Sequence, residues 1–368
     1  MKRSEIESLF ENELRRAIER SDLPPRPDPI CATPWVAMSL LQKAVRRGRR
    51  DLALRAAATL RRDAPERLWR RLGCIASEDV GLGDLDAVGL VTAALAGSRF
   101  RAALGGEWAV ANCVIDALAR APKCRAADDL LMACERRPAY AQDRAELRAL
   151  PTRELIAIAS RPGPVHRRAL ALWCALGGGS RALGLRRRGE AQRVFDDLRH
   201  AGWPERIVEI ARLGRRRTGE LLGPFVALLY RELAGPTGVK ADERPPETMI
   251  GGTPSWAYDL YSREGRAAFA RFLRSDAASA AWLRGRVDPG RRVAFFGHIV
   301  FRVEGGLVDH RMRRPLADHL RREADVECSG PECRDASEIL ALARADIPRL
   351  NEARAEVLGE ARHAAVPF

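Results

Sequence analysis

Residues 35–48, WVAMSLLQKAVRRG, decide the fold class of this chain, because their apolar side chains recur with the period of an α-helix. The apolar face of this helix consists of Ala37, Leu40, Leu41, Ala44 and Val45. Gly48 ends the helix, and residues 51–61 predict an alanine-rich second helix that returns antiparallel to the first. The stretch therefore predicts a helical hairpin.

Further helices are predicted after this hairpin. Pro65 marks the first turn of a third helix, and Asp84 can cap a fourth. The segments 108–118 and 125–134 also show helical periodicity. Because short loops join these helices, we predict that residues 35–136 form a compact multi-helix bundle in an all-α, mainly helical fold.

The rest of the chain divides where its composition changes. We expect an N-terminal amphipathic helix at 1–22, a proline-rich linker at 23–34, a helical extension at 137–235, a loop at 236–254 and a mainly helical C-terminal region at 255–368. Within the last region, the apolar run 293–303 is compatible with a buried helix or with a short β element.

Arginine makes the chain strongly basic. The formal net charge is +14, and lysine occurs only at positions 2, 43, 123 and 240. A guanidinium pairs well with phosphate, so an acidic polymer such as DNA is a natural partner. A codon bias toward Ala, Arg, Gly and Leu would give the same excess, so composition alone leaves both explanations open.

The sequence predicts neither a membrane span nor a disulfide framework. No stretch approaches 18 uninterrupted apolar residues, and the N-terminus lacks an apolar signal region. Eight cysteines lie at irregular spacings, several of them inside apolar helical patterns. We therefore expect a cytoplasmic protein.

Two motifs occur here in the same order as in a known family. The first is ASEDVGLGD, residues 76–84, and the second is APK, residues 121–123. Residues 36–135 resemble the C-terminal helical region of RarA- or MgsA-type AAA+ ATPases, which are replication-associated relatives of the clamp loaders. Cys124 and Arg125 stand where that family usually has serine and asparagine. The residues that carry the family pattern are Trp69, Arg70, Arg71, Glu78, Asp79, Gly81, Asp84, Pro122 and Lys123.

The resemblance implies a clamp-loader-type collar, a helical module through which subunits assemble beside DNA. It leads us to expect a homo-oligomer that binds DNA without sequence preference, with an AAA+ ATPase or another replication protein as a further partner. The chain contains no Gly-x-x-x-x-Gly-Lys-Ser/Thr loop. We therefore expect no cofactor and no nucleotide hydrolysis.

Four carboxylates lie within nine positions, at Glu78, Asp79, Asp84 and Asp86. A divalent-metal site needs converging ligands, whereas these residues straddle a predicted helix end. Acids in the last turn of a helix face the negative end of its dipole and need a compensating neighbour. We expect a structural ion pair, with the compensation coming from Arg70, Arg71, Lys123 or the amino end of the next helix.

No metal or catalytic site is predicted. His310, His319, Cys328 and Cys333 are spaced by eight, eight and four residues, which fits zinc poorly. His298 lies in an apolar run and is read as a core histidine that needs a polar partner. No Ser/His/Asp or Cys/His order nominates a nucleophile.

Four arginine clusters are candidates for contact with phosphates. Each lies at a predicted helix end or loop, where its side chains can reach a nucleic-acid backbone. The candidates are Arg46, Arg47, Arg49, Arg50, Arg186, Arg187, Arg188, Arg215, Arg216, Arg217, Arg311, Arg313 and Arg314. The segment 252–266 adds three aromatic residues among arginines, which suits either stacking on single-stranded nucleic acid or packing on the core with Ser262 capping the next helix.

Three hypotheses for function follow. The first is a non-catalytic DNA-associated or replication-associated binding protein that combines the collar-like module with arginine patches. The second is a protein-only adaptor or regulator of an AAA+ ATPase, in which the charge is compositional. The third is a metal-dependent enzyme built on the C-terminal third of the chain.

Overall fold

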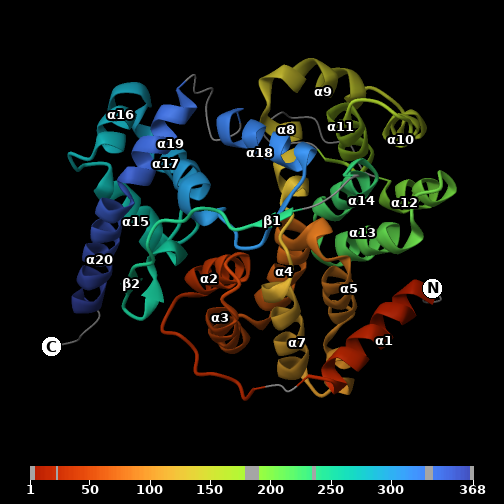
Figure 1. Cartoon of the computed structure of the whole chain (residues 1–368), viewed down its shortest axis with the longest axis horizontal. Coiled ribbons are helices and arrows are strands. Elements are labelled where there is room, and N and C mark those ends of the chain that lie inside the picture. Colours follow the sequence, from red (N-terminus) through yellow and green to blue (C-terminus); the bar gives the residue numbers. More distant parts are fainter. Residues whose placement is uncertain (1–4, 22–23, 179–189, 234–237, 328–334, 365–368) are drawn as a thin grey trace. The chain divides into compact units, whose positions relative to one another are not determined.

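A computed structural model describes residues 5–21, 24–178, 190–233, 238–327 and 335–364, most of which lie in α-helices (Figure 1). The predicted all-α class is therefore confirmed. None of the described helices is both long enough and apolar enough to span a membrane.

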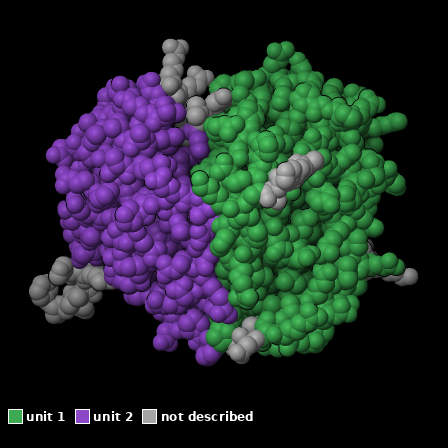
Figure 2. Space-filling view, viewed as in Figure 1, with its two compact units in different colours: residues 1–24, 69–240, 310–324 green, residues 25–68, 241–309, 325–368 purple. Residues whose placement is uncertain are grey.

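The chain divides into two compact units, which Figure 2 colours separately. Unit 1 comprises residues 1–24, 69–240 and 310–324, and unit 2 comprises residues 25–68, 241–309 and 325–368. Both units are thus assembled from segments that are far apart in the sequence.

These units follow the predicted boundaries only in part. The chain passes between units inside the expected linker 23–34 and again inside the expected loop 236–254. The expected bundle 35–136 is divided between Leu68 and Trp69, and its second part shares unit 1 with the expected extension 137–235. Periodicity along the chain carries no information about which helices pack together, so it could not reveal this division.

Unit 1 is built mainly from helices. They are α1 (Glu5–Glu19), α5 (Leu85–Ala94), α6 (Ser98–Ala103), α7 (Glu107–Arg120), α8 (Ala126–Arg136), α9 (Ala141–Arg148), α10 (Thr152–Ser160), α11 (Val165–Ala175), α12 (Ala191–His200), α13 (Glu205–Thr218) and α14 (Leu222–Glu232). Helices α4 (Pro65–Ile75) and α18 (Pro315–Glu327) each have residues in both units. Strands β1 (Gly238–Lys240) and β4 (Arg311–Arg313) pair antiparallel, with Val239 opposite Met312.

Unit 2 contains α2 (Pro34–Arg46), α3 (Arg50–Asp63), α15 (Arg263–Phe272), α16 (Ala278–Arg286), α17 (Arg292–Val300), α19 (Ala336–Ala345) and α20 (Ile347–Ala364). Strands β2 (Met249–Ile250) and β3 (Thr253–Pro254) form a small hairpin. The predicted hairpin of α2 and α3 is present, with Thr33 as the N-cap of α2 and Gly48 in the left-handed region at φ 64°. Glycine suits this turn because it has no Cβ to clash.

The run 293–303 is helical, so its interpretation as a β element was wrong. It forms α17 and a π-helical turn, Phe301–Gly305. Phe296 of α17 stacks on Phe272 with ring centroids 4.7 Å apart, inside the core of unit 2. Apolar residues here cover the helix almost all round, and this is the pattern that periodicity cannot distinguish from a buried strand.

Candidate functional site

The two family-like motifs lie against each other in unit 1. Residues 76–80 form a π-helical turn after α4, and the amide of Cys124 donates to the carbonyl oxygen of Val80 at 3.1 Å. A Cβ at Gly81 would lie 2.9 Å from the Cys124 oxygen, and one at Gly83 would lie 2.1 Å from the Pro122 oxygen. Both glycines are therefore required by the close approach of a second backbone.

Arg125 is a cation that binds the acidic pair of the first motif. Its guanidinium is buried with Asp79, which is fully buried, and it also bonds Asp128 and reaches Glu78 Oε1 at 3.1 Å. Burial alone would lower the pKa of Arg125, but the carboxylates of Asp128, Asp79 and Glu78 outweigh it and raise the pKa well above its ordinary value. A structural ion pair is thus present at the acidic motif, with Arg125 as a cation that the sequence-based expectation had not named.

Arg125 is not among the cations that the sequence led us to expect here. It is the residue that departs from the family pattern, and it follows the motif lysine by two positions. The presence of an arginine in the loop of the second motif was the one feature of the sequence that could have identified this cation. Asp84 does cap α5 as expected, accepting from the amides of Asp86 and Ala87 at 3.0 and 2.9 Å.

Lys123 is fully buried and holds its own loop in place. Its ammonium donates to the carbonyl oxygens of Ala119, at 3.1 Å, and Ala121 at the carboxyl end of α7. Its backbone amide donates to His310 at 2.8 Å, and its carbonyl accepts from Met312 at 2.9 Å. The second motif is therefore fixed by the segment that leads into β4.

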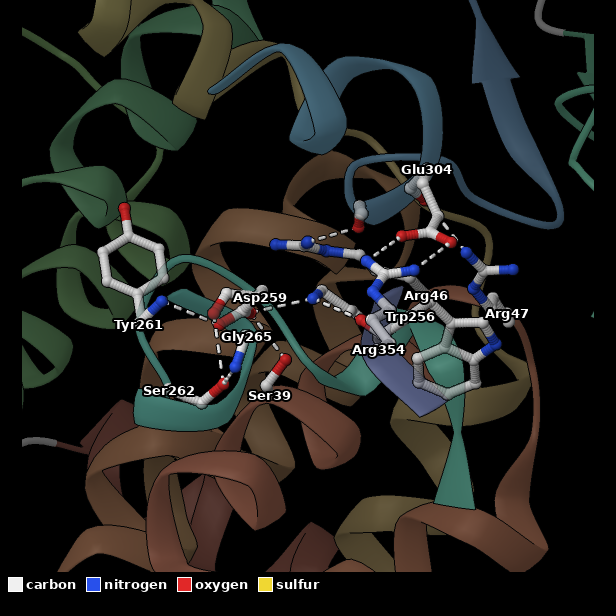
Figure 3. A network of polar contacts seen from close by, with 12 residues as sticks. Ser39, Arg46, Arg47, Trp256, Asp259, Tyr261, Ser262, Gly265, Glu304 and Arg354 are labelled. Atoms are coloured by element: carbon white, nitrogen blue, oxygen red, sulfur yellow. Dashed lines mark hydrogen bonds and ion pairs between the residues drawn. The ribbon is translucent and has the colours of Figure 1, made fainter. Parts of the chain in front are cut away.

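A buried polar network occupies unit 2, and Figure 3 shows it from close by. Glu304 accepts from both terminal nitrogens of Arg354, at 3.1 and 2.8 Å, and both side chains are almost fully buried. Arg46 donates to the Gly305 carbonyl at 2.8 Å. Arg47 donates to the Glu304 carbonyl at 2.9 Å. Burial opposes the charge of Glu304, but Arg354, together with Arg47 and Lys43, outweighs it and lowers the pKa of this carboxyl.

A second part of the network joins α2 to the segment before α15. Lys43 donates to Asp259 Oδ2 at 2.8 Å and to the Trp256 carbonyl at 2.6 Å. Ser39 donates to the same carboxylate oxygen at 2.6 Å. Burial lowers the pKa of Lys43, although Asp259 opposes this shift. Because these groups bind one another inside the fold, the network holds backbone segments together.

One feature of the sequence, a lysine within an apolar helical pattern, points to this network. Lys43 lies three residues after Leu40, on the apolar face of the predicted helix. A charged residue on that face needs a buried partner. The partner, Asp259, lies in a distant segment, so only the folded chain identifies it.

The structure contradicts part of the predicted phosphate-binding set. Arg46, Arg47 and Arg311 are buried, at 2 %, 5 % and 6 % relative exposure, so they do not project from helix ends into solvent. Arg49 is more open but binds Asp51 and Glu247. Arg50 is half-buried. Arg46 and Arg47, at the end of α2, donate to carbonyl oxygens of residues 304–305 in unit 2 and do not face solvent, while Arg311 lies in β4 of unit 1.

The remaining clusters are more exposed. Arg216 and Arg217 are exposed, and Arg216 reaches Glu7 at 3.3 Å, while Arg215 donates to the Leu176 carbonyl at 2.7 Å. Arg313 is exposed and binds Asp318 at 2.8 Å. The half-buried Arg314 donates to the Leu233 carbonyl. Arg186, Arg187 and Arg188 lie outside the described residues.

The family-pattern residues before the acidic motif differ in exposure. Trp69 is buried and donates to Glu107 at 2.6 Å, and the Arg101 guanidinium lies over its ring. Arg70 is exposed, and Arg71 is half-buried.

The aromatic segment 252–266 mostly packs inward. Trp256 and Tyr258 are buried, whereas Tyr261 is 69 % exposed. Ser262 caps α15, as expected, by accepting from the Gly265 amide at 3.0 Å. Of the two interpretations left open by the sequence, core packing therefore holds for two of the three aromatic residues.

No grouping of His, Cys, Asp or Glu within the described ranges could hold a metal ion. Cys328 and Cys333 lie outside those ranges, while His319 lies 3.1 Å from Glu323. His298 is half-buried. Burial raises the pKa of Cys74 to about 12, so this thiol is inert at neutral pH.

The comparisons with known proteins add no relative: no family model, no curated protein and no solved structure matches this chain.

Proposed function

We propose that this protein is a non-catalytic, DNA-associated binding protein of the replication or recombination machinery. Its helical region around residues 69–136 would act as a collar-like module for self-association or partner binding, and surface arginines would contact phosphates. The proposal rests on the resemblance of residues 36–135 to the RarA-type helical region.

One observation carries the proposal. The two motifs that make up the resemblance, 76–84 and 121–123, pack on each other, and the amide of Cys124, directly after the second motif, donates to the Val80 carbonyl oxygen. Gly81 and Gly83 stand where any Cβ would strike the second segment. Two motifs that derive from one module are expected to contact each other in the fold. Two short motifs that match the family by chance are not.

The charge of the chain supports a nucleic-acid partner. The net charge is +14, and Arg216, Arg217 and Arg313 remain exposed after the buried candidates are set aside. Phosphate contacts of this kind position a duplex without reading its sequence.

Titration of the full chain with a fluorescent DNA duplex at several salt concentrations tests the proposal. Binding is expected to weaken steeply as salt rises, with similar affinity for unrelated sequences. The double variant Arg216→Gln/Arg217→Gln should bind more weakly and with a shallower salt dependence. Arg349→Gln is the control, because this exposed arginine binds Asp276 and Glu352. Absence of binding at low salt to this duplex and also to single-stranded DNA would overturn the proposal.

A second candidate is a protein-only adaptor of an AAA+ ATPase. Part of the positive charge lies in the interior, where it cannot contact DNA, and this observation favours the second candidate. The buried arginines are Arg46, Arg47, Arg125 and Arg354. Co-elution of the purified chain with a purified RarA-type ATPase, unchanged by nuclease and accompanied by no DNA binding, would select this candidate over the first.

A further inference from the structure

Tyr261 is the most exposed large apolar or aromatic side chain among the described residues. Its exposure of 69 % exceeds the 51 % of Val239 and of Met249 and the 49 % of Trp35. Figure 3 shows its ring pointing away from the buried network of unit 2. An aromatic ring with most of its surface exposed beside a well-packed segment is a candidate contact for a ligand.

The backbone that carries this ring is held firmly. The Tyr261 amide donates to Asp259 Oδ1 at 2.9 Å, and the other carboxylate oxygen of Asp259 binds Lys43 and Ser39. Ser262, fully buried, donates to the Asp259 carbonyl at 3.1 Å. A ring presented on a fixed backbone loses little conformational entropy when it binds a partner.

Gly265 completes this corner of the chain. A Cβ at this position would lie 2.0 Å from the Asp259 carbonyl oxygen, so glycine allows α15 to begin directly against the preceding turn. The position of Tyr261 relative to the start of α15 is therefore fixed by contacts within unit 2.

Two exposed arginines, Arg263 and Arg266, follow Tyr261 in the first turns of α15, with Glu264 between them. No ion pair joins either arginine to a carboxylate among the residues that the structure describes. Farther along the same helix, Arg271 binds both Glu356 and Glu360. Positions three apart lie on one side of a helix, so the two unpaired guanidiniums are neighbours. The negative charge of Asp259 is offset by Lys43.

We infer that Tyr261, Arg263 and Arg266 form a contact site for single-stranded nucleic acid. A base stacks on the Tyr261 ring, and the two guanidiniums contact backbone phosphates next to that base. A duplex is a poor ligand for this one site, because its bases are stacked on each other and hide their faces, although it can still contact arginines elsewhere on the chain. The inference rests on the proposed function and adds to it the strandedness of the ligand and the residues that recognise it.

The test compares variants of the full chain by fluorescence anisotropy with a labelled oligodeoxythymidylate and with a matched duplex. Tyr261→Ala should weaken binding to the single strand by about tenfold and leave duplex binding nearly unchanged. Tyr261→Phe should retain the affinity, because stacking needs the ring. Arg263→Gln/Arg266→Gln should reduce the salt dependence for the single strand by about 1.4 in logarithmic slope.

Tyr230→Ala is the matched control, because Tyr230 is 47 % exposed and lies in α14 of unit 1. It should leave the affinity for both ligands unchanged. Unchanged single-strand affinity of Tyr261→Ala, with clear DNA binding by the unaltered chain, overturns this inference and leaves the proposed function standing. A loss of single-strand affinity in Tyr261→Phe as large as that in Tyr261→Ala also overturns this inference. Failure of the unaltered chain to bind any nucleic acid overturns both.

Discussion

The Arg125 guanidinium faces three carboxylates, those of Glu78, Asp79 and Asp128, from inside unit 1. An exposed pair of this kind would contribute little to stability. Here Arg125 is 3 % exposed and Asp79 is fully buried, so loss of the Arg125 guanidinium leaves the Asp79 carboxylate away from water and without this counter-charge.

Arg125→Ala should therefore lower the free energy of unfolding by about 3–5 kcal/mol, measured by urea denaturation at pH 7. Arg120→Ala is the matched control, because its side chain is 75 % exposed and pairs with Asp116 on the surface of α7. A loss below about 1 kcal/mol is expected there. Equal losses of unfolding free energy in the two variants would show that burial does not increase the contribution of the Arg125 ion pair to stability.

Glu304 makes the stability of the fold depend on pH. Burial would raise its pKa, but the cations of Arg354, Arg47 and Lys43 together outweigh burial and lower the pKa below the ordinary value of 4.5. A carboxyl with a lower pKa in the folded chain stabilises the fold above its unfolded pKa, and this contribution disappears as the pH falls toward the folded pKa.

We therefore expect Glu304→Gln to destabilise the chain clearly at pH 7 and much less in acid, below the ordinary pKa of 4.5. Urea denaturation at a series of pH values measures both effects. The same destabilisation by Glu304→Gln throughout that range would contradict this account, since it would mean that the ionised state of the carboxyl does not matter.

At the scale of elements, the approach of the turn at residues 81–83 to the segment after α7 depends on glycine. A Cβ at Gly83 would lie 2.1 Å from the backbone oxygen of Pro122, which cannot move as a flexible side chain can. By contrast, Gly285 lies near the end of α16 with no atom within 4 Å of the added Cβ.

Substitution of these two glycines by alanine should change the free energy of unfolding in opposite directions. Gly83→Ala should destabilise the protein by about 1–3 kcal/mol, because the two segments must separate. Gly285→Ala should stabilise it by about 0.5–1 kcal/mol, because alanine restricts the unfolded chain and suits a helix. Chemical denaturation of both variants measures the effects, and a stabilised Gly83→Ala variant would refute the close approach.

At the scale of the whole molecule, the two units draw on interleaved parts of the chain. Residues 35–68 belong to unit 2 and residues 69–136 to unit 1. The backbone partners of Lys123 are His310 and Met312, and α8 packs on α14, so a fragment ending at 136 lacks contacts that unit 1 requires.

We expect an isolated fragment of residues 35–136 to be helical in part but without a cooperative thermal transition. Circular dichroism of this fragment beside the full chain measures both properties. A sharp, reversible transition in the fragment would mean that the segment is an autonomous domain, as the sequence alone suggests.

Local features of the fold could be predicted from the sequence. The apolar spacing after Trp35 predicted the hairpin of α2 and α3, and Ser262 and Asp84 were identified as helix caps. These predictions succeed because helical hydrogen bonds and caps connect residues within four positions of each other. The run 293–303 resisted the same reasoning because it is apolar all round.

The sequence by itself determined that the chain is helical, where many of its helices begin, and that two motif segments share a family-like order. Only the tertiary structure decided that Arg125 binds Asp79, that Arg46 and Arg47 are buried, and which segments form each unit. Burial and ion pairing arise between residues far apart in the chain, and a solvated arginine and a buried one look the same in the sequence.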